Sequence, residues 1–202
     1  MDTSELEAAY RSVLDLAARA PGDRPGDRPG PGRTPMDTSE LEAAYRSVLG
    51  LAARRTGTSG TGDAPGAAVA GDGEVWGPDE VLAHLVLNDR LLARAVRSVL
   101  DGTARPYDNL DAIDVAELRT LTRDLGDTAG LIGGLEASSR ELIDLAGRLD
   151  EAQGATPVPV RILDGDQLVV DNPLPVRSLL NIQARRHLPM HQAQLGELLE
   201  PS

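Results

Sequence analysis

The chain must build its hydrophobic core almost without aromatic side chains. Its 202 residues include no Phe, one Trp and three Tyr, although hydrophobic residues make up 41% of the sequence. Leu, Val and Ala must therefore fill the interior, and a core of this kind favours helices packed on helices over an aromatic-rich β-sandwich. The length suits one compact domain with some additional sequence. We therefore expect an all-α fold.

A segment near the N-terminus occurs twice. Residues 1–20 return as residues 36–55, with changes only at positions 15 and 20 of the first copy. The apolar residues of each copy fall on one face of a helix. Such near-identity indicates a recent duplication, because the repeats of a solenoid diverge and at least three of them are needed for stability.

Because a bundle offers a single position for this helix, we expect the second copy to occupy it. Residues 1–35 then consist of a duplicated helix and a Pro/Gly-rich linker, and residues 36–202 form the folded domain. Exchange of the first copy into a neighbouring molecule is a minor alternative, which would make the protein oligomerise.

Two helices are expected in the middle of the chain. Pro78 is a favourable first-turn residue of one helix, which ends near Gly102 because Gly is a common C-terminal stop. A loop follows over residues 103–114. Asp114 and Glu117 have the spacing of a capping box for a third, long helix that runs to about residue 150. Glycines weaken the middle of that helix, so we expect it to bend or break there.

The end of the chain combines an extended segment with a last helix. Residues 157–171 alternate apolar and polar side chains around the sequence Asp-Gly-Asp, which predicts a small β-hairpin or an extended loop. Residues 173–199 form the last helix. The sequence therefore predicts an all-α, four-helix bundle with a small hairpin or extended loop before its last helix.

Charge and cysteine content exclude several classes of protein. The net charge is −12 and every basic side chain is Arg or His, so nucleic acid is not an expected partner. The absence of cysteine excludes disulfides, thiolate nucleophiles and Cys-ligated zinc. No apolar run reaches the ~18–20 residues that span a bilayer, and no signal peptide is recognisable. We expect a cytoplasmic protein that does not bind membranes.

The chain has three histidines: His84, His187 and His191. His187 and His191 lie four residues apart on the last helix, which places both side chains on one face about 6 Å apart. One ion at metal–nitrogen distances of about 2.1 Å can reach both. His84 lies midway along the helix that starts at Pro78, between apolar neighbours. Spacing alone is a weak indication, because two histidines at this spacing are more often solvated or hydrogen-bonded.

Two stretches around these histidines resemble the DinB-like superfamily, which includes mycothiol- and bacillithiol-dependent S-transferases and maleylpyruvate isomerases. They are WGPDEVLAHL, which ends after His84, and RHLPMHQAQL, which contains His187 and His191. The family pattern has a Trp shortly before an HL dipeptide and a later H-x-x-x-H. The resemblance covers roughly residues 36–200. It implies a four-helix bundle in which the three histidines hold one divalent metal ion, usually zinc or nickel.

Pro189 departs from a regular helix between the two C-terminal histidines. A proline inside a helix cannot donate to the carbonyl four residues earlier, here that of Arg185, and costs about 3 kcal/mol. We expect a kink near Arg185, with His187 and His191 still on a shared face.

The resemblance implies a metal-dependent enzyme that acts on a small-molecule substrate. Three neutral imidazoles leave a coordination position open, as in catalytic sites. The expected activity is that of a thiol-dependent transferase or isomerase with a low-molecular-weight thiol cosubstrate, or metal-activated-water chemistry on a small electrophile. The alternative is a non-catalytic bundle that binds metal or a small ligand, because no general acid or base stands out. The sequence favours the enzyme modestly. The resemblance also implies a homodimer.

Polar side chains within one helical turn of the histidines are candidates to orient an imidazole. They are Glu80, Asn88, Gln183 and Gln194. Polar residues on helices are more often simply solvated, and no catalytic residue is identified. Trp76 is expected to anchor the core at the start of its helix. Asp89 and Arg90 are expected on the surface.

Overall fold

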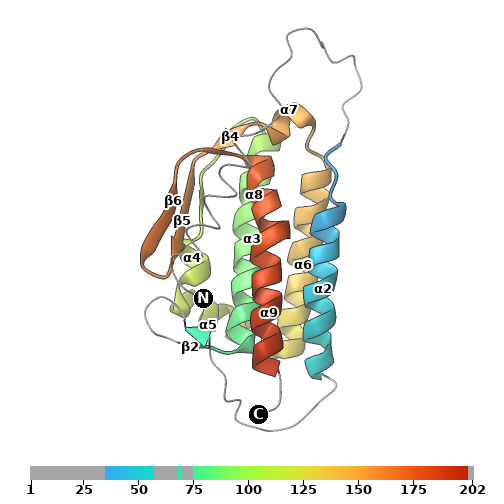
Figure 1. The fold of residues 1–202 in the computed structure, drawn as a ribbon, viewed down its shortest axis with the longest axis vertical. Coiled ribbons are helices and arrows are strands. Elements are labelled where there is room, and N and C mark those ends of the chain that lie inside the picture. Colours follow the sequence, from blue (N-terminus) through green and yellow to red (C-terminus); the bar gives the residue numbers. More distant parts are fainter. Residues whose placement is uncertain (1–34, 57–67, 70–74, 200–202) are drawn as a thin grey trace.

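The computed structural model describes residues 35–56, 68–69 and 75–199, and within them the fold is mostly helical. The long helices lie side by side along the molecule (Figure 1). The first copy of the repeat and the linker behind it lie outside the described residues. The helices are α2 (Ser39–Thr56), α3 (Pro78–Leu100), α4 (Leu110–Ile113), α5 (Val115–Leu125), α6 (Thr128–Gly147), α7 (Glu151–Gly154), α8 (Val176–Ile182), the π-helix η1 (Gln183–His187) and α9 (Leu188–Leu199).

The second copy of the repeat forms α2, as the sequence predicts. Its buried face consists of Leu41, Tyr45, Val48 and Ala52, and it packs against α6, η1 and α9. Two acidic residues lie in its first turn, where they interact favourably with the helix dipole. One copy of the repeated segment therefore supplies one wall of the bundle.

The helix α3 runs through the centre of the fold. It begins at Pro78 and is followed by Gly102, whose φ of 74° is readily adopted by glycine, so both expected ends are confirmed. Its contacts reach α4, α5, α6, α8 and α9. Most of its residues are buried, because helices cover it on several sides.

The third helix of the prediction is two helices, α5 and α6. The break falls at Gly126, which has a φ of 93°, and the side chain of Asp127 then caps α6 by accepting from the Gly130 amide at 2.9 Å. Asp114 caps α5 as expected, accepting from the amides of Ala116 and Glu117. The long helix also ends earlier than predicted, at Gly147.

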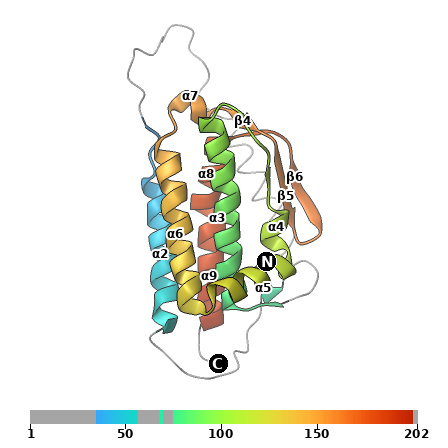
Figure 2. The ribbon, with the colours of Figure 1, turned by 180° about the vertical axis from the view of Figure 1, so that it is seen from behind.

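Short strands flank the helices. They are β1 (Ala68–Val69), β2 (Val75–Trp76), β3 (Tyr107–Asp108), β4 (Pro157–Val158), β5 (Val160–Asp164), β6 (Gln167–Asp171) and β7 (Leu174–Pro175). The predicted hairpin is β5–β6, which pairs antiparallel. It lies on the flank of the bundle away from α2, as Figures 1 and 2 both show.

The stretch predicted as a loop after α3 contains a strand and a short helix, so this prediction was wrong. Residues 107–108 form β3, which pairs in parallel with β5, and α4 follows directly. Asn109 strengthens the junction, because its side chain donates to the Leu163 carbonyl and accepts from the Leu163 amide, both at 2.8 Å. The partner strand is more than 50 residues away in sequence, so no local pattern could indicate it.

The last helix is a continuous segment of α8, η1 and α9. Of the helices in the described part of the chain, none combines the length and apolar character needed to cross a membrane.

Candidate metal centre

The three histidines of the chain converge in the interior of the bundle. His84 comes from α3, His187 ends η1 and His191 lies in α9. One ligand nitrogen from each can be chosen so that all three lie within 4.8 Å of one another. The ring centroids are 4.6 to 5.0 Å apart. We call these three residues the histidine cluster.

Hydrogen bonds fix which nitrogen of two rings is free to bind a cation. Nδ1 of His84 lies 2.7 Å from the Ala112 carbonyl oxygen in α4, and Nδ1 of His191 lies 2.7 Å from Oε1 of Gln194. Because both oxygens only accept, each Nδ1 carries the hydrogen and each Nε2 carries a lone pair. The histidine cluster therefore directs at least two lone pairs inward.

Among the described residues, one of these two lone pairs has no donor, and the other faces a ring nitrogen of His187. Nε2 of His191 and Nδ1 of His187 are buried without a hydrogen-bond partner among the described residues. Nε2 of His84 lies 2.9 Å from Nε2 of His187. A tetrahedral ion with metal–nitrogen distances of about 2.1 Å separates its ligands by about 3.4 Å, which lies between the shortest and longest separations in the cluster. The residues present therefore fit a divalent metal ion.

Burial keeps the histidine cluster uncharged. It lowers the pKa of His84 to about 4 and that of His191 to about 3. The pKa of His187 is also well below its usual value, because of burial first and the neighbouring rings of His191 and His84 second. Neutral imidazoles are the form that binds metal ions, so at neutral pH all three rings are ready to bind one.

The π-helix explains how the last helix directs Gln183 and its two histidines to one face. Pro189 cannot donate to the Arg185 carbonyl, and the Leu188 amide donates instead to the Gln183 carbonyl, five residues earlier. In an α-helix, four residues overshoot a full turn by about 40°, whereas a π turn holds more residues. The wider turn offsets that drift, so Gln183 and the two histidines face α3 together. The irregularity expected near Arg185 takes this form.

Of the four predicted orienting residues, one contacts a histidine directly. Gln194 accepts the hydrogen bond from His191, three residues before it. Glu80 instead accepts from the Gly77 amide at 3.0 Å and closes the N-terminus of α3. Asn88 donates to Oε1 of Gln183 at 2.9 Å, and neither of these residues hydrogen-bonds to a histidine. The Ala112 carbonyl was not predicted, because a backbone oxygen leaves no signal in the sequence.

Asp89 is buried, with 0% of its surface exposed, and the prediction of a surface position was wrong. Its carboxylate accepts hydrogen bonds from the Tyr45 hydroxyl, from Ser138 at 2.9 Å and from Nε2 of Gln183 at 3.1 Å. Burial raises the pKa of Asp89 to about 7 against the opposing effect of these donors. We call Asp89 and these three donors the Asp89 cluster. Arg90 is exposed, as predicted.

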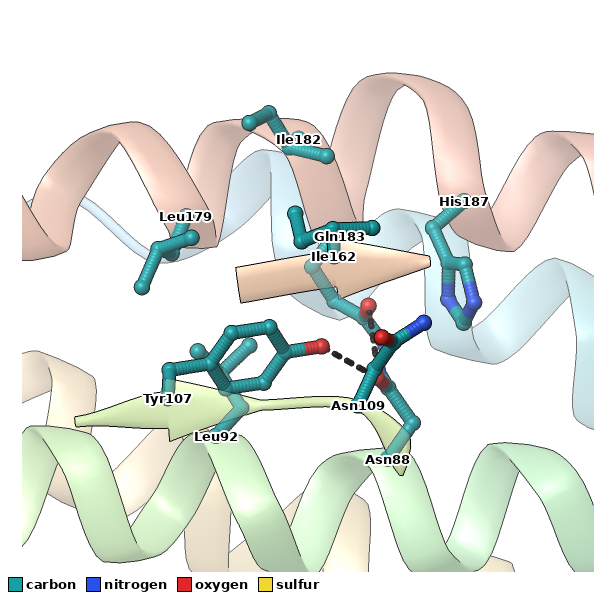
Figure 3. Close-up of a pocket in the computed structure, with 9 residues that line it drawn as sticks. All are labelled: Asn88, Leu92, Tyr107, Asn109, Ile162, Leu179, Ile182, Gln183 and His187. Atoms are coloured by element: carbon teal, nitrogen blue, oxygen red, sulfur yellow. Dashed lines mark hydrogen bonds between the residues drawn. The ribbon is translucent and has the colours of Figure 1, made fainter. Parts of the chain in front are cut away.

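A cavity of about 40 Å³ adjoins the histidine cluster at His187. Figure 3 shows the His187 ring directed from the last helix toward the space bordered by Asn88, Tyr107 and Asn109. The cavity is lined by Asn88, Leu92, Tyr107, Asn109, Ile162, Leu179, Ile182, Gln183 and His187. Apart from the imidazole, its polar groups are amides and a phenol. The predicted residues Asn88 and Gln183 therefore line the space beside the cluster.

Trp76 packs against the histidine cluster as well as the core. It is 8% exposed, and its ring centroid lies 5.0 Å from that of His84. The predicted role as an anchor at the start of α3 therefore extends to fixing one side of the His84 ring.

Comparison of the chain with family models, with curated proteins and with solved structures finds no match. The function must therefore be argued from the residues and their geometry.

Proposed function

We propose that the chain is a metal-dependent enzyme of the DinB-like type, in which the histidine cluster holds one zinc or nickel ion. The observation that supports this best is the convergence of three uncharged imidazoles, two buried and that of His187 half-buried, with nitrogens left unpaired among the described residues. The mostly helical fold, with its long helices side by side, agrees with the four-helix bundle of that superfamily.

The residues around the cluster fix the orientation of its rings and line the cavity beside it. Gln194 and the Ala112 carbonyl fix the orientation of two rings. A divalent ion held by these three residues would act as a Lewis acid and would lower the pKa of a group bound to it. The cavity at His187 has room for a small uncharged group beside the histidine cluster.

The proposed reaction is transfer of a low-molecular-weight thiol to a small electrophile. The sulfur forms a bond to an electrophilic carbon, the leaving group departs with the electron pair of the broken bond, and the thiol proton passes to solvent. The thiol must come from solution because the chain has no cysteine. Isomerisation with a thiol, or attack by activated water, uses the same site.

A second candidate is a bundle that binds a metal or small ligand without turnover. The observation in its favour is the cavity lining, which contains no carboxylate that could serve as a general base. Asp89 is a buried acid linked to the cavity lining by its hydrogen bond from Gln183. Its carboxylate already accepts from three donors.

Elemental analysis of the untagged protein tests the metal site. We expect about one equivalent of divalent metal in the wild type, and its loss in His84→Ala and His191→Ala. Met190→Ala is the matched control, because Met190 precedes His191 and is exposed, and it should retain the metal. Wild-type protein that takes up no zinc or nickel would exclude the metal site.

Turnover separates the two candidates. The metal-loaded protein is incubated with a panel of thiols and a chromogenic electrophile, and adduct formation is compared with that of His191→Ala. Thiol-dependent turnover lost in the variant supports the enzyme. Metal binding without turnover, or turnover retained in the variant, rejects it.

A further inference from the structure

The segment that forms α2 is present twice in the chain, whereas the described bundle has one position for it. The buried side chains of α2 are Leu41, Tyr45, Val48 and Ala52. Each has an identical counterpart 35 residues earlier, at Leu6, Tyr10, Val13 and Ala17. Every apolar group by which α2 is buried in the bundle is therefore available from residues 1–20 as well.

The polar contacts of α2 are duplicated too. Tyr45 donates to the buried Asp89, and Glu40 accepts two hydrogen bonds from Arg185, at 2.6 and 2.9 Å. Tyr10 and Glu5 stand at the same places in the first copy. The phenol that satisfies Asp89 and the carboxylate that pairs with Arg185 thus exist in both copies.

One of the two differences between the copies falls where the bundle leaves open space. Gly50 corresponds to Asp15, and Gly50 is exposed with no atom within 4 Å of where a Cβ would stand. The other difference is at position 55, in the last turn of α2. An aspartate at position 50 therefore meets open space, and it replaces a glycine that is unfavourable inside a helix.

We propose that residues 1–20 can replace α2 in the same molecule, so that one position in the bundle accepts either copy. Docking of residues 1–20 into the bundle of a second molecule adds no contacts overall, because each chain then still has one copy outside a bundle. A tethered segment also competes at an effective concentration far above that of a second molecule.

The second copy is the more populated occupant. The connection to α3 is longer from residue 20 than from residue 55, and this favours the second copy a few-fold through loop closure. The Met36 amide also donates to the Leu149 carbonyl at 2.9 Å, next to a bridge between Pro35 and Asp150.

Matched aspartate substitutions test the proposal. Val48 is 0% exposed, so Val48→Asp expels the second copy from the bundle. We expect Val48→Asp to keep a cooperative thermal transition, with a midpoint only a few degrees lower, because the first copy takes over. Val13→Asp should match the wild type, and the double variant should lose the transition. A Val48→Asp protein as unfolded as the double variant overturns the proposal, and so does a double variant that folds.

Cross-linking identifies where the first copy docks. The chain has no cysteine, so Glu5→Cys and Arg185→Cys provide the only thiols. In the Val48→Asp background we expect a short bis-maleimide to link them within one chain, as it links Glu40→Cys to Arg185→Cys in the wild-type background. A linked dimer would place the first copy in a second molecule and overturn the same-molecule assignment. Absence of any link would overturn docking itself.

Discussion

Two buried polar clusters lie side by side between α3 and the last helix, and they differ in how their hydrogen bonds are completed. In the Asp89 cluster, one carboxylate accepts from three donors supplied by three different helices. In the histidine cluster, the outer nitrogens of two rings are bonded and the inner ones face each other. The first cluster has an acceptor for each of its donors, whereas in the second Nε2 of His191 and Nδ1 of His187 have no partner among the described residues. The balance of donors and acceptors, rather than burial, separates a structural network from a ligand site.

The largest expected difference concerns stability without metal. Asp89→Leu removes the acceptor of the buried Tyr45 hydroxyl and the bonds that Ser138 and Gln183 donate to the carboxylate, so it should cost about 1–3 kcal/mol of unfolding free energy. His191→Leu removes Nε2, which has no partner among the described residues, and one hydrogen bond, from Nδ1 to Gln194, so its cost should be about 1 kcal/mol or less. Urea unfolding in the presence of a chelator measures both. Equal losses would show that the two clusters are alike.

Metal addition should act on one cluster alone. At free zinc or nickel a hundredfold above the dissociation constant, a site that exists only in the folded state adds about 2.7 kcal/mol. We expect this gain in the wild type and in Asp89→Asn, and its absence in His191→Leu. Thermal unfolding with and without metal is the measurement. A gain of the same size in His191→Leu would place the metal elsewhere.

The two clusters should respond to pH with opposite signs in metal-free protein. The folded pKa values of His84 and His191 lie near 4 and 3, below the ordinary 6.5. The unfolded chain therefore binds more protons as pH falls below about 6.5, and stability drops. Asp89 has a folded pKa of about 7 against 3.8. Its contribution is full below 3.8 and is lost as pH rises through 7.

The variant Asp89→Asn removes the contribution of the Asp89 carboxyl to the pH dependence of stability and leaves that of the histidines. Stability should rise with pH more steeply in the variant than in the wild type between about pH 4.5 and 6.5, by up to about 1.4 kcal/mol per pH unit. Urea unfolding across this range gives the slopes. Parallel slopes would mean that the Asp89 carboxyl does not bind its proton in this range in the folded protein.

The smallest effect is expected at the edge of the histidine cluster. Gln194→Leu removes the acceptor that orients His191 and should weaken metal binding about 10–100-fold. Competition with a chromophoric chelator measures the affinity. Gln192→Leu is the control, since it is a glutamine one residue from His191 whose change should leave affinity intact. Equal effects of both changes would remove Gln194 from the metal centre.

The sequence predicts those parts of the molecule that depend on local patterns. Apolar periodicity and end signals were enough for α2 and α3, and alternation around Asp-Gly-Asp was enough for the β5–β6 hairpin. The parallel pairing of β3 with β5 was missed, because two residues of strand carry no pattern and their partner is distant. The break at Gly126 falls where the glycines predicted that the long helix would bend or break.

The residues of the candidate site were likewise predictable only where local patterns indicate them. The histidines and Gln194 could be found by helical spacing and by the resemblance. Asp89 was misplaced because an isolated carboxylate is costly to bury, and Tyr45 and Ser138, which make its burial tolerable, lie 44 and 49 residues away.

The π-helix at Gln183–His187 gives the last helix a constraint on its turn geometry. Its first residue, Gln183, belongs to the Asp89 cluster, whereas its last residue, His187, belongs with His191 to the histidine cluster. A π turn holds one residue more than an α turn, so conversion to an α turn with no residue removed would rotate one half of the helix against the other by about 100°. Either half could then face α3, but not both. Over evolutionary time we expect this segment to keep its π turn together with Gln183 and His187.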